Sequence, residues 1–269
     1  MKKFKRRSAR ANLQHFRVLT ARYFRQIFTN LGVLLPLILE APVMLLILRL
    51  VCRTDAFAAK KIAQANVIIF VLIVMAAFMG ILNSYREICK ERDVLAREVF
   101  GGLDVSAYVL SKIAVLSAIG AVQSALLFGG SLLFIDFSFP HPLSAYPLCF
   151  LAMILTNISV TALGLLVSAL LKKSESAILP VLLIIIVQVV FSDCLIKVGG
   201  ADFIKYITPS YWGISVFGNA VGINGWVAGY SKTMNDIHPL FSLGALLLFA
   251  FLCVVLATMK LRREFRQKD

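Results

Sequence analysis

Residues 65–98 read ANVIIFVLIVMAAFMGILNS-YREICKERDVLARE, a long stretch without a charged residue followed directly by a densely charged one. The first part, residues 65–84, has the roughly 20 residues that a helix needs to cross a hydrocarbon layer about 30 Å thick. Backbone groups in lipid need hydrogen-bond partners within their own segment, so this stretch predicts a transmembrane α-helix. The charged part then predicts a segment at the membrane surface.

Five further apolar stretches of similar length surround this one. The chain has 269 residues, of which 59% are hydrophobic, and its mean hydropathy is +0.85. Soluble domains average about 45–50% apolar residues. The sequence therefore predicts an all-α membrane protein with six transmembrane helices, at residues 31–50, 65–84, 113–135, 147–171, 177–196 and 239–259.

The basic residues fall mainly on one side of this topology. The net charge is +14, and 21 of the 28 Lys and Arg lie in residues 1–30, 85–112, 172–173 and 260–269. Positive residues are retained on the cytoplasmic side of a membrane. We therefore expect a multi-pass protein of the plasma (bacterial inner) membrane, with both termini in the cytoplasm. Anionic membrane lipid attracts such residues by about 1 kcal/mol each, so the charge requires no nucleic acid partner.

Three regions divide the chain: residues 1–30, a basic tail with an amphipathic helix; residues 31–259, the transmembrane domain; and residues 260–269, a basic tail. Residues 13–28 place their apolar side chains on one helical face, which predicts a helix lying in the membrane interface. The outer segment, residues 192–238, is rich in glycine and aromatic residues, which favours a re-entrant segment before the last span.

The charged loop, residues 85–112, has the pattern of a short helical hairpin. Glu87 and Lys90 are three residues apart and can form a supporting ion pair, as can other opposite charges in the loop. Gly101 and Gly102 predict the end of this helix, and Asp104 or Ser106 can cap the next one. A solvated charged loop is the alternative.

One acidic residue interrupts the first span. A charge such as Glu40 costs roughly 2.5–3.5 kcal/mol at mid-membrane, so it needs a partner or a wet surface. It can serve binding or coupling, or it can be protonated or hydrogen-bonded to a neighbouring helix. Other polar residues within the spans are expected to form interhelical hydrogen bonds. These are Asn66, Gln123, Asn157, Thr161 and Gln188.

Motifs for catalysis are absent from the sequence. It contains no GxxxxGK[ST], HExxH, GxSxG or CxxC pattern, so neither nucleotide binding nor enzymatic activity is expected of this chain itself. The three histidines fall in separate segments, and no metal site is expected. Cys52 and Cys194 lie near outer ends of spans, and the sequence leaves open whether they pair.

The order of segments and three short motifs resemble the permease of type-2 ABC exporters, with the closest likeness to the ABCG (White-like) branch. The motifs are Glu91-Arg92 with Arg97-Glu98 followed by two glycines and Tyr108, the run KSESA at residues 173–177, and the run ITPSYW at residues 207–212. The resemblance implies a coupling helix with Glu91, Arg92, Arg97 and Glu98, and a connecting helix with Arg22 or Arg25.

The same resemblance implies an assembly around this chain. ABCG proteins carry their ATPase on the same chain, whereas this sequence has none. ATP and magnesium are therefore expected in a separate ATPase subunit, and the alternative is that the chain is the permease piece of a larger fusion. A second permease copy, identical or not, would form a dimer with a central cavity. The implied cavity residues are Phe70, Met75, Phe78, Val187, Val190 and Phe191. Their apolar character suits a lipid, glycolipid, drug or peptide cargo.

Two other classes of protein remain open. A membrane receptor or immunity protein without transport activity could dock a partner through the charged loop. A membrane enzyme acting on lipid would need paired acids near the surface, and Glu87, Glu91, Asp93 and Glu98 form the sole cluster of this kind. The Arg and Lys residues interspersed among them suit docking better than catalysis.

Overall fold

The computed structural model describes residues 12–52, 56–173, 175–194, 203–227 and 230–266, and every regular element in these ranges is a helix. The predicted basic stretch 1–11 lies outside the described residues. The longer helices are α1 (Leu13–Thr29), α2 (Leu31–Val51), α3 (Ile62–Ser84), α5 (Val105–Ser131), α6 (Pro142–Leu170), α7 (Ile178–Val190), α9 (Pro209–Val221) and α11 (Pro239–Arg266). The shorter ones are η1 (Cys89–Glu91), α4 (Arg92–Phe100), η2 (Glu175–Ala177), α8 (Phe203–Ile207), η3 (Ile223–Gly225) and α10 (Thr233–Asp236).

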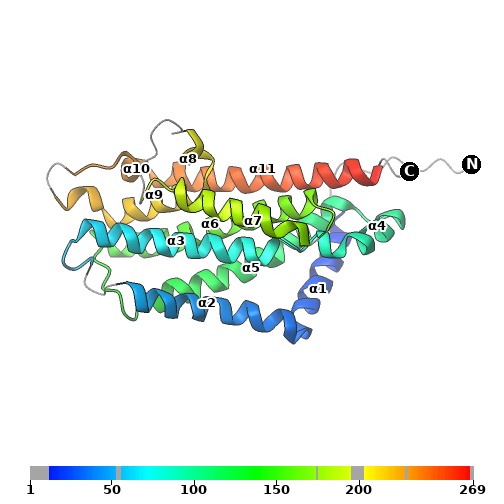
Figure 1. The fold of residues 1–269 in the computed structure, drawn as a ribbon, viewed down its shortest axis with the longest axis horizontal. Coiled ribbons are helices and arrows are strands. Elements are labelled where there is room, and N and C mark those ends of the chain that lie inside the picture. The colour runs from blue at the N-terminus through cyan, green and yellow to red at the C-terminus, as the bar shows by residue number, and fades with distance from the viewer. Residues whose placement is uncertain (1–11, 53–55, 174, 195–202, 228–229, 267–269) are drawn as a thin grey trace, which may run out of the picture.

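Five long apolar helices run along the length of the molecule (Figure 1). Within the described residues, α2, α3, α5, α6 and α11 are long and apolar enough to cross a membrane. This confirms the predicted all-α membrane class. The predicted fifth span, residues 177–196, corresponds to α7, which has 13 residues. At 1.5 Å per residue α7 is about 20 Å long. The count of six spans therefore stays a prediction, and residues 195–196 lie outside the described ranges.

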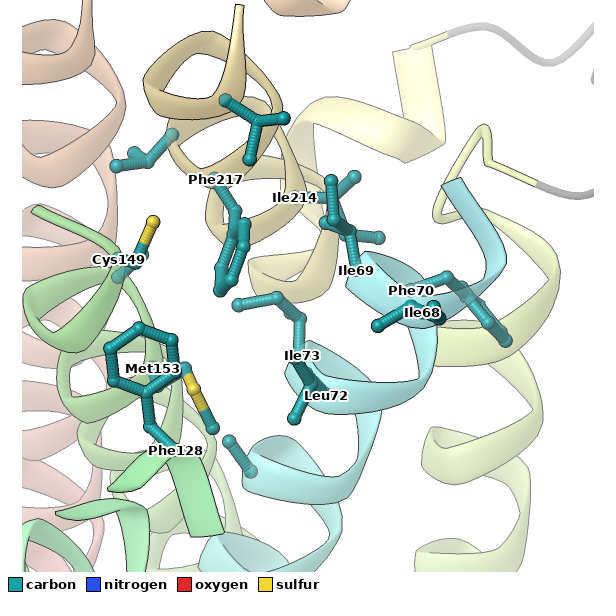
Figure 2. Packing of buried hydrophobic residues seen from close by; sticks show 14 of the residues in the cluster. Ile68, Ile69, Phe70, Leu72, Ile73, Phe128, Cys149, Met153, Ile214 and Phe217 are labelled. Carbon is teal, nitrogen blue, oxygen red and sulfur yellow. The ribbon is translucent and has the colours of Figure 1, made fainter. Parts of the chain in front are cut away.

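Helix α6 occupies the middle of the bundle and packs against α3, α5, α9 and α11. Helix α9, which packs against α6, is buried along nearly its whole length. Figure 2 shows Ile214 and Phe217 of α9 facing Ile69 and Ile73 of α3 within one hydrophobic cluster. Helix α9 begins with Pro209, whose fixed φ suits a first helical turn, and ends before Gly222 at φ 70°.

The predicted interhelical hydrogen bonds are present. Asn157 Nδ2 on α6 donates to the carbonyl of Ala76 on α3 at 3.0 Å. Thr161 Oγ1 donates to the carbonyl of Gly80 at 3.3 Å, so two consecutive turns of α6 bind α3. Gln188 Oε1 accepts from the backbone N–H of Ser210 at 3.0 Å, and Asn66 Nδ2 donates to Tyr230 Oη at 3.0 Å. The bonds of Asn157, Thr161 and Gln188 join apolar helices where a lone polar group would be costly, whereas Asn66 bonds a residue in the segment between η3 and α10.

Two helices at the periphery leave most of their apolar surface uncovered. Ala41 and Leu48 are the buried residues of α2, and Val181 and Gln188 are those of α7. Many of the other Leu, Ile and Val side chains of these helices are exposed, as expected for helices that face lipid or another membrane protein. Cys52 and Cys194 are both free thiols in the structure.

Candidate functional site

The described parts of the charged segments meet at one end of the bundle, here called the α4 end. Figure 1 shows α1, α4 and the C-terminal part of α11 together at this end. Hydrogen bonds and ion pairs join these elements to each other and to the last turn of α6. The opposite end, which holds α9 and α10, is called the α9 end.

A buried lysine organises the centre of the α4 end. Lys112 lies in the second turn of α5, and its side chain is 2% exposed. Its ammonium Nζ lies 2.8 Å from Glu91 Oε2 and 3.4 Å from Glu87 Oε2. The same atom lies 3.6 Å from the centroid of the Tyr23 ring, a cation–π contact from α1. A buried charge needs such partners, because an unpaired one would be strongly destabilising.

Hydroxyl groups and a second amine complete this cluster. Tyr23 Oη donates to Glu87, and Tyr108 Oη donates to Glu91 Oε2 at 2.9 Å. Burial raises the pKa of the Tyr23 phenol well above its usual range, and the neighbouring Glu87 carboxylate raises it further, so the phenol stays protonated and remains a donor. Lys90 pairs with Glu87, as the sequence predicted. The two negative charges of Glu87 and Glu91 are therefore balanced by the two positive charges of Lys90 and Lys112.

Arg92 fixes the start of α4 to two distant helices. Its guanidinium forms a two-pronged ion pair with Glu264 of α11, in which Nε lies 3.2 Å from Oε1. It also donates to the carbonyl of Leu171 at the end of α6, where helix carbonyls lack partners within the helix. In the turn before α4, Ser168 Oγ of α6 accepts from the backbone N–H of Ile88 at 2.9 Å. Helix α4 is thus attached to both α6 and α11.

The end of α4 is attached to α1. Arg22 pairs with Glu98 through both guanidinium nitrogens, at 2.5 and 3.1 Å. Gln26 Nε2 donates to Glu91 Oε1 at 3.2 Å from the next turn of α1. Arg25 is exposed on α1, and the structure shows no hydrogen bond or ion pair of its side chain to the described residues. Of the two predicted connecting-helix arginines, Arg22 is the one in this network.

The loop after α4 follows the predicted pattern. Helix α4 ends at Phe100, and Gly102 adopts φ 104°, a conformation that favours glycine. Asp104 then caps α5 by accepting from the N–H of Ser106 at 3.0 Å. The same carboxylate accepts from the N–H of Asn12 at 2.8 Å and lies 3.8 Å from Arg262 of α11. The starts of α1 and α5 and the end of α11 therefore meet at one carboxylate.

One face of α4 is left uncovered. Asp93, Val94, Arg97 and Phe100 are exposed, and Phe100 is 86% exposed. Arg97 donates to the backbone carbonyl of Asp93 at 3.4 Å, within its own helix. Aromatic and Arg side chains are enriched at protein–protein interfaces, so the composition of this face is compatible with a protein contact.

The other predicted residues lie elsewhere in the bundle. Phe70 and Met75 are buried in the main hydrophobic cluster, and Phe78 is half-buried beside α7. Val187 is exposed on α7, whereas Val190 and Phe191 are half-buried near its end. A single chain does not bring these six residues together into one cavity.

Glu40 of α2 is half-buried against α5. Its Oε2 accepts from Gln123 Nε2 at 2.9 Å, whereas its Oε1 is buried without a partner among the described residues. Gln123 Oε1 in turn accepts from Asn83 of α3 at 2.7 Å. The neighbouring-helix alternative predicted for Glu40 is thus present.

Sequence reasoning missed three members of the α4 end. Lys112, Tyr108 and Glu264 were not assigned to an ion-pair network, although each is polar at the edge of an apolar stretch. A lysine at the predicted start of a span is the one available signal, because a charge there is retained only with partners or water.

These features define a polytopic helical membrane protein with a charged helix at one end, fixed on one face and exposed on the other. The sequence matches the family described as ABC-2 type transporter over residues 14–221, and the chain belongs to that family. It is therefore a membrane permease component of an ABC transporter. It is also 31% identical over 180 residues to the ABC transporter ATP-binding/permease protein Rv1747 of Mycobacterium tuberculosis, covering 64% of this chain and 20% of the relative. The match thus spans about a fifth of that relative's length.

Proposed function

We propose that this chain is the membrane-spanning subunit of an ATP-driven exporter and that a separate ATPase subunit, which binds ATP and magnesium, drives it through α4. The observation that supports this best is the difference between the two faces of α4. One face is fixed to four other helices of the chain by ion pairs and hydrogen bonds, and the other face is exposed.

The fixed face explains how motion would be transmitted. Arg92 binds α6 and α11, Glu91 binds α1 and α5, and Glu98 binds α1. A push on α4 would therefore move these helices together rather than bend a loop, as expected for rigid-body switching. In this proposal Glu91, Arg92 and Glu98 position α4, whereas Arg97 and Phe100 contact the ATPase.

The path of the cargo requires a second permease copy, identical or different. Helices α3 and α7 carry the six residues of the implied cavity, and α7 exposes most of its apolar side chains in a single chain. A second copy packed there would enclose a surface that includes Phe78 and Val187, whereas Phe70 and Met75 are buried within the single chain. Such a lining suits a hydrophobic or amphipathic cargo that passes by alternating access.

The orientation follows from charge. The α4 end carries the basic residues, so it would face the cytoplasm of the plasma (bacterial inner) membrane, together with both termini. This places α4 on the side where ATP is available. A cysteine in place of Phe100 should then react with an impermeant maleimide only after the cytoplasmic side is opened.

The test is copurification from the native membrane in mild detergent. The wild-type chain should bring a P-loop ATPase with it in near-equal amount. Phe100→Ser should lose the ATPase without lowering the thermal stability of the chain, because Phe100 is 86% exposed. Leu143→Ser is the matched control, since Leu143 is 95% exposed at the α9 end.

Two outcomes would count against the proposal. If no ATPase copurifies in several mild detergents, a receptor or immunity protein that docks another partner through α4 becomes the better account. If the ATPase stays bound to Phe100→Ser and to Phe100→Ser combined with Arg97→Glu, the exposed face of α4 is not the contact.

A further inference from the structure

A cleft of about 560 Å³ lies at the α4 end, between α1, α2, the end of α3 and α5. Its walls include Val33, Leu37, Glu40, Leu82, Arg86 and Lys90. Its volume falls within the range of roughly 300–1,000 Å³ that is typical of ligand sites. None of the contacts described above fills it.

The mouth of the cleft is positively charged. The guanidinium carbon of Arg86 lies 4.8 Å from the centroid of the Tyr85 ring. Arg86 has no carboxylate partner among the residues that the structure describes. Lys90 beside it pairs with Glu87 and remains half-exposed. Lys90 pairs with Glu87 and Lys112 pairs with Glu91, so the guanidinium of Arg86 is a positive charge at the mouth without a carboxylate partner among the described residues.

The walls behind the mouth are apolar and open to the side. Val33 and Leu37 of α2 face Leu82 of α3 and Leu116 of α5 across the cleft. Leu82 is 39% exposed and Pro36 is exposed, so the cleft is not sealed between α2 and α3. These two helices are candidate membrane spans, and the cleft therefore opens toward the surrounding lipid.

One acidic side chain also lines the cleft. Glu40 Oε2 accepts from Gln123 Nε2 at 2.9 Å, and Glu40 Oε1 is buried without a hydrogen-bond donor in the described part of the chain. The buried Oε1 is not open to a molecule in the cleft, so recognition depends on the mouth and the apolar walls. An occupant with an anionic group and an apolar part would match these two features.

We propose that this cleft binds an anionic phospholipid of the surrounding bilayer. The guanidinium of Arg86 holds the phosphate with two parallel hydrogen bonds, which suit its planar fork, and Lys90 supports it. The acyl chains lie along Val33, Leu37 and Leu82. This inference needs only the membrane position of the chain and does not rest on the transport activity proposed above.

The experiment measures lipid binding to the purified full chain, without ATPase or cargo. Fluorescent phosphatidylglycerol, an anionic phospholipid, is titrated against the wild-type chain and against Arg86→Gln. Loss of a charge-assisted hydrogen bond predicts binding about tenfold weaker for Arg86→Gln. Arg97→Gln removes the same charge from exposed α4 outside the cleft and should bind as the wild type does.

Two comparisons complete the test. Phosphatidylcholine should bind more weakly than phosphatidylglycerol, because its choline adds a positive charge beside Arg86 and Lys90. Soluble glycerol 3-phosphate should not compete at millimolar concentration. Equal phosphatidylglycerol affinities for Arg86→Gln and Arg97→Gln would overturn the proposal. Full competition by glycerol 3-phosphate would overturn it as well, since it would show a site for free phosphate rather than for a lipid.

Discussion

The ammonium of Lys112 lies 2.8 Å from the carboxylate of Glu91, and both groups are withdrawn from solvent at the junction of α4 and α5. They lie 21 positions apart in the sequence, and the hairpin of Gly101 and Gly102 brings them together. The pair joins the start of the partly exposed helix α4 to the base of a candidate membrane span. The stability of α4 should therefore depend on residues that no partner protein touches.

Replacing Lys112 with methionine should be the most damaging change at the α4 end. It would leave Glu87 and Glu91 without their buried cation, and breaking a buried pair typically costs about 3–5 kcal/mol. Thermal unfolding in detergent should show a large drop for Lys112→Met. The exposed Lys173→Met is the control and should unfold like the wild type. Combining Lys112→Met with Glu91→Gln should restore part of the loss, and no recovery would argue against the pairing.

The ion pair of Arg92 with Glu264 should show measurable coupling across 172 residues of sequence. Residues in direct contact commonly give coupling energies of about 0.5–3 kcal/mol in double-mutant cycles. We expect at least about 1 kcal/mol from the unfolding free energies of Arg92→Ala, Glu264→Ala and the double variant. Arg92→Lys should recover little, because lysine lacks the planar fork. Additive effects of the two alanine variants would show that the coupling energy between Arg92 and Glu264 is close to zero.

Gly80 should not tolerate a side chain. A Cβ at this position would lie 2.5 Å from the backbone carbonyl oxygen of Asn157, where α3 and α6 cross closely. Gly80→Ala should force the two helices apart and cost about 1–3 kcal/mol. Gly244 on α11 has open space at the same position, so Gly244→Ala should be neutral or slightly stabilising. Equal unfolding temperatures for the two variants would contradict the close crossing.

Gln123 should be important for the packing of three helices. It donates to the carbonyl of Leu37 at 2.9 Å and to Glu40, and it accepts from Asn83. Gln123→Leu keeps a similar size but leaves these groups unpaired, at an expected cost of about 1–3 kcal/mol. Unfolding measured beside the exposed Gln14→Leu control would test this. A Gln123→Leu chain as stable as the control would mean that water replaces the lost bonds.

Local sequence features predicted the long helices well. The expected span at residues 31–50 corresponds to α2, Leu31–Val51, and that at residues 65–84 corresponds to α3, Ile62–Ser84. The stop at Gly101 and Gly102 and the cap at Asp104 also occur as predicted. These features depend on hydropathy and on interactions between residues a few positions apart. Helix α7 is shorter than the span predicted from hydropathy at residues 177–196, because the helix ends at Val190.

The candidate site required the folded chain. The family resemblance implied one coupling set of Glu91, Arg92, Arg97 and Glu98, whereas the structure gives them different surroundings. Glu91, Arg92 and Glu98 bind other helices, and Arg97 is exposed beside Phe100. Nothing in the local sequence distinguishes these roles, because each depends on a partner from a distant segment.

The sequence by itself determined that the chain is a helical membrane protein with a charged helix after its second span. Long apolar stretches and capping residues act locally, and the membrane leaves little choice but helix. Only the tertiary structure decided which charges stabilise that helix and which face remains for a partner. Ion pairs such as Lys112 with Glu91 and Arg92 with Glu264 form where helix packing brings distant segments together, and packing is a property of the whole bundle.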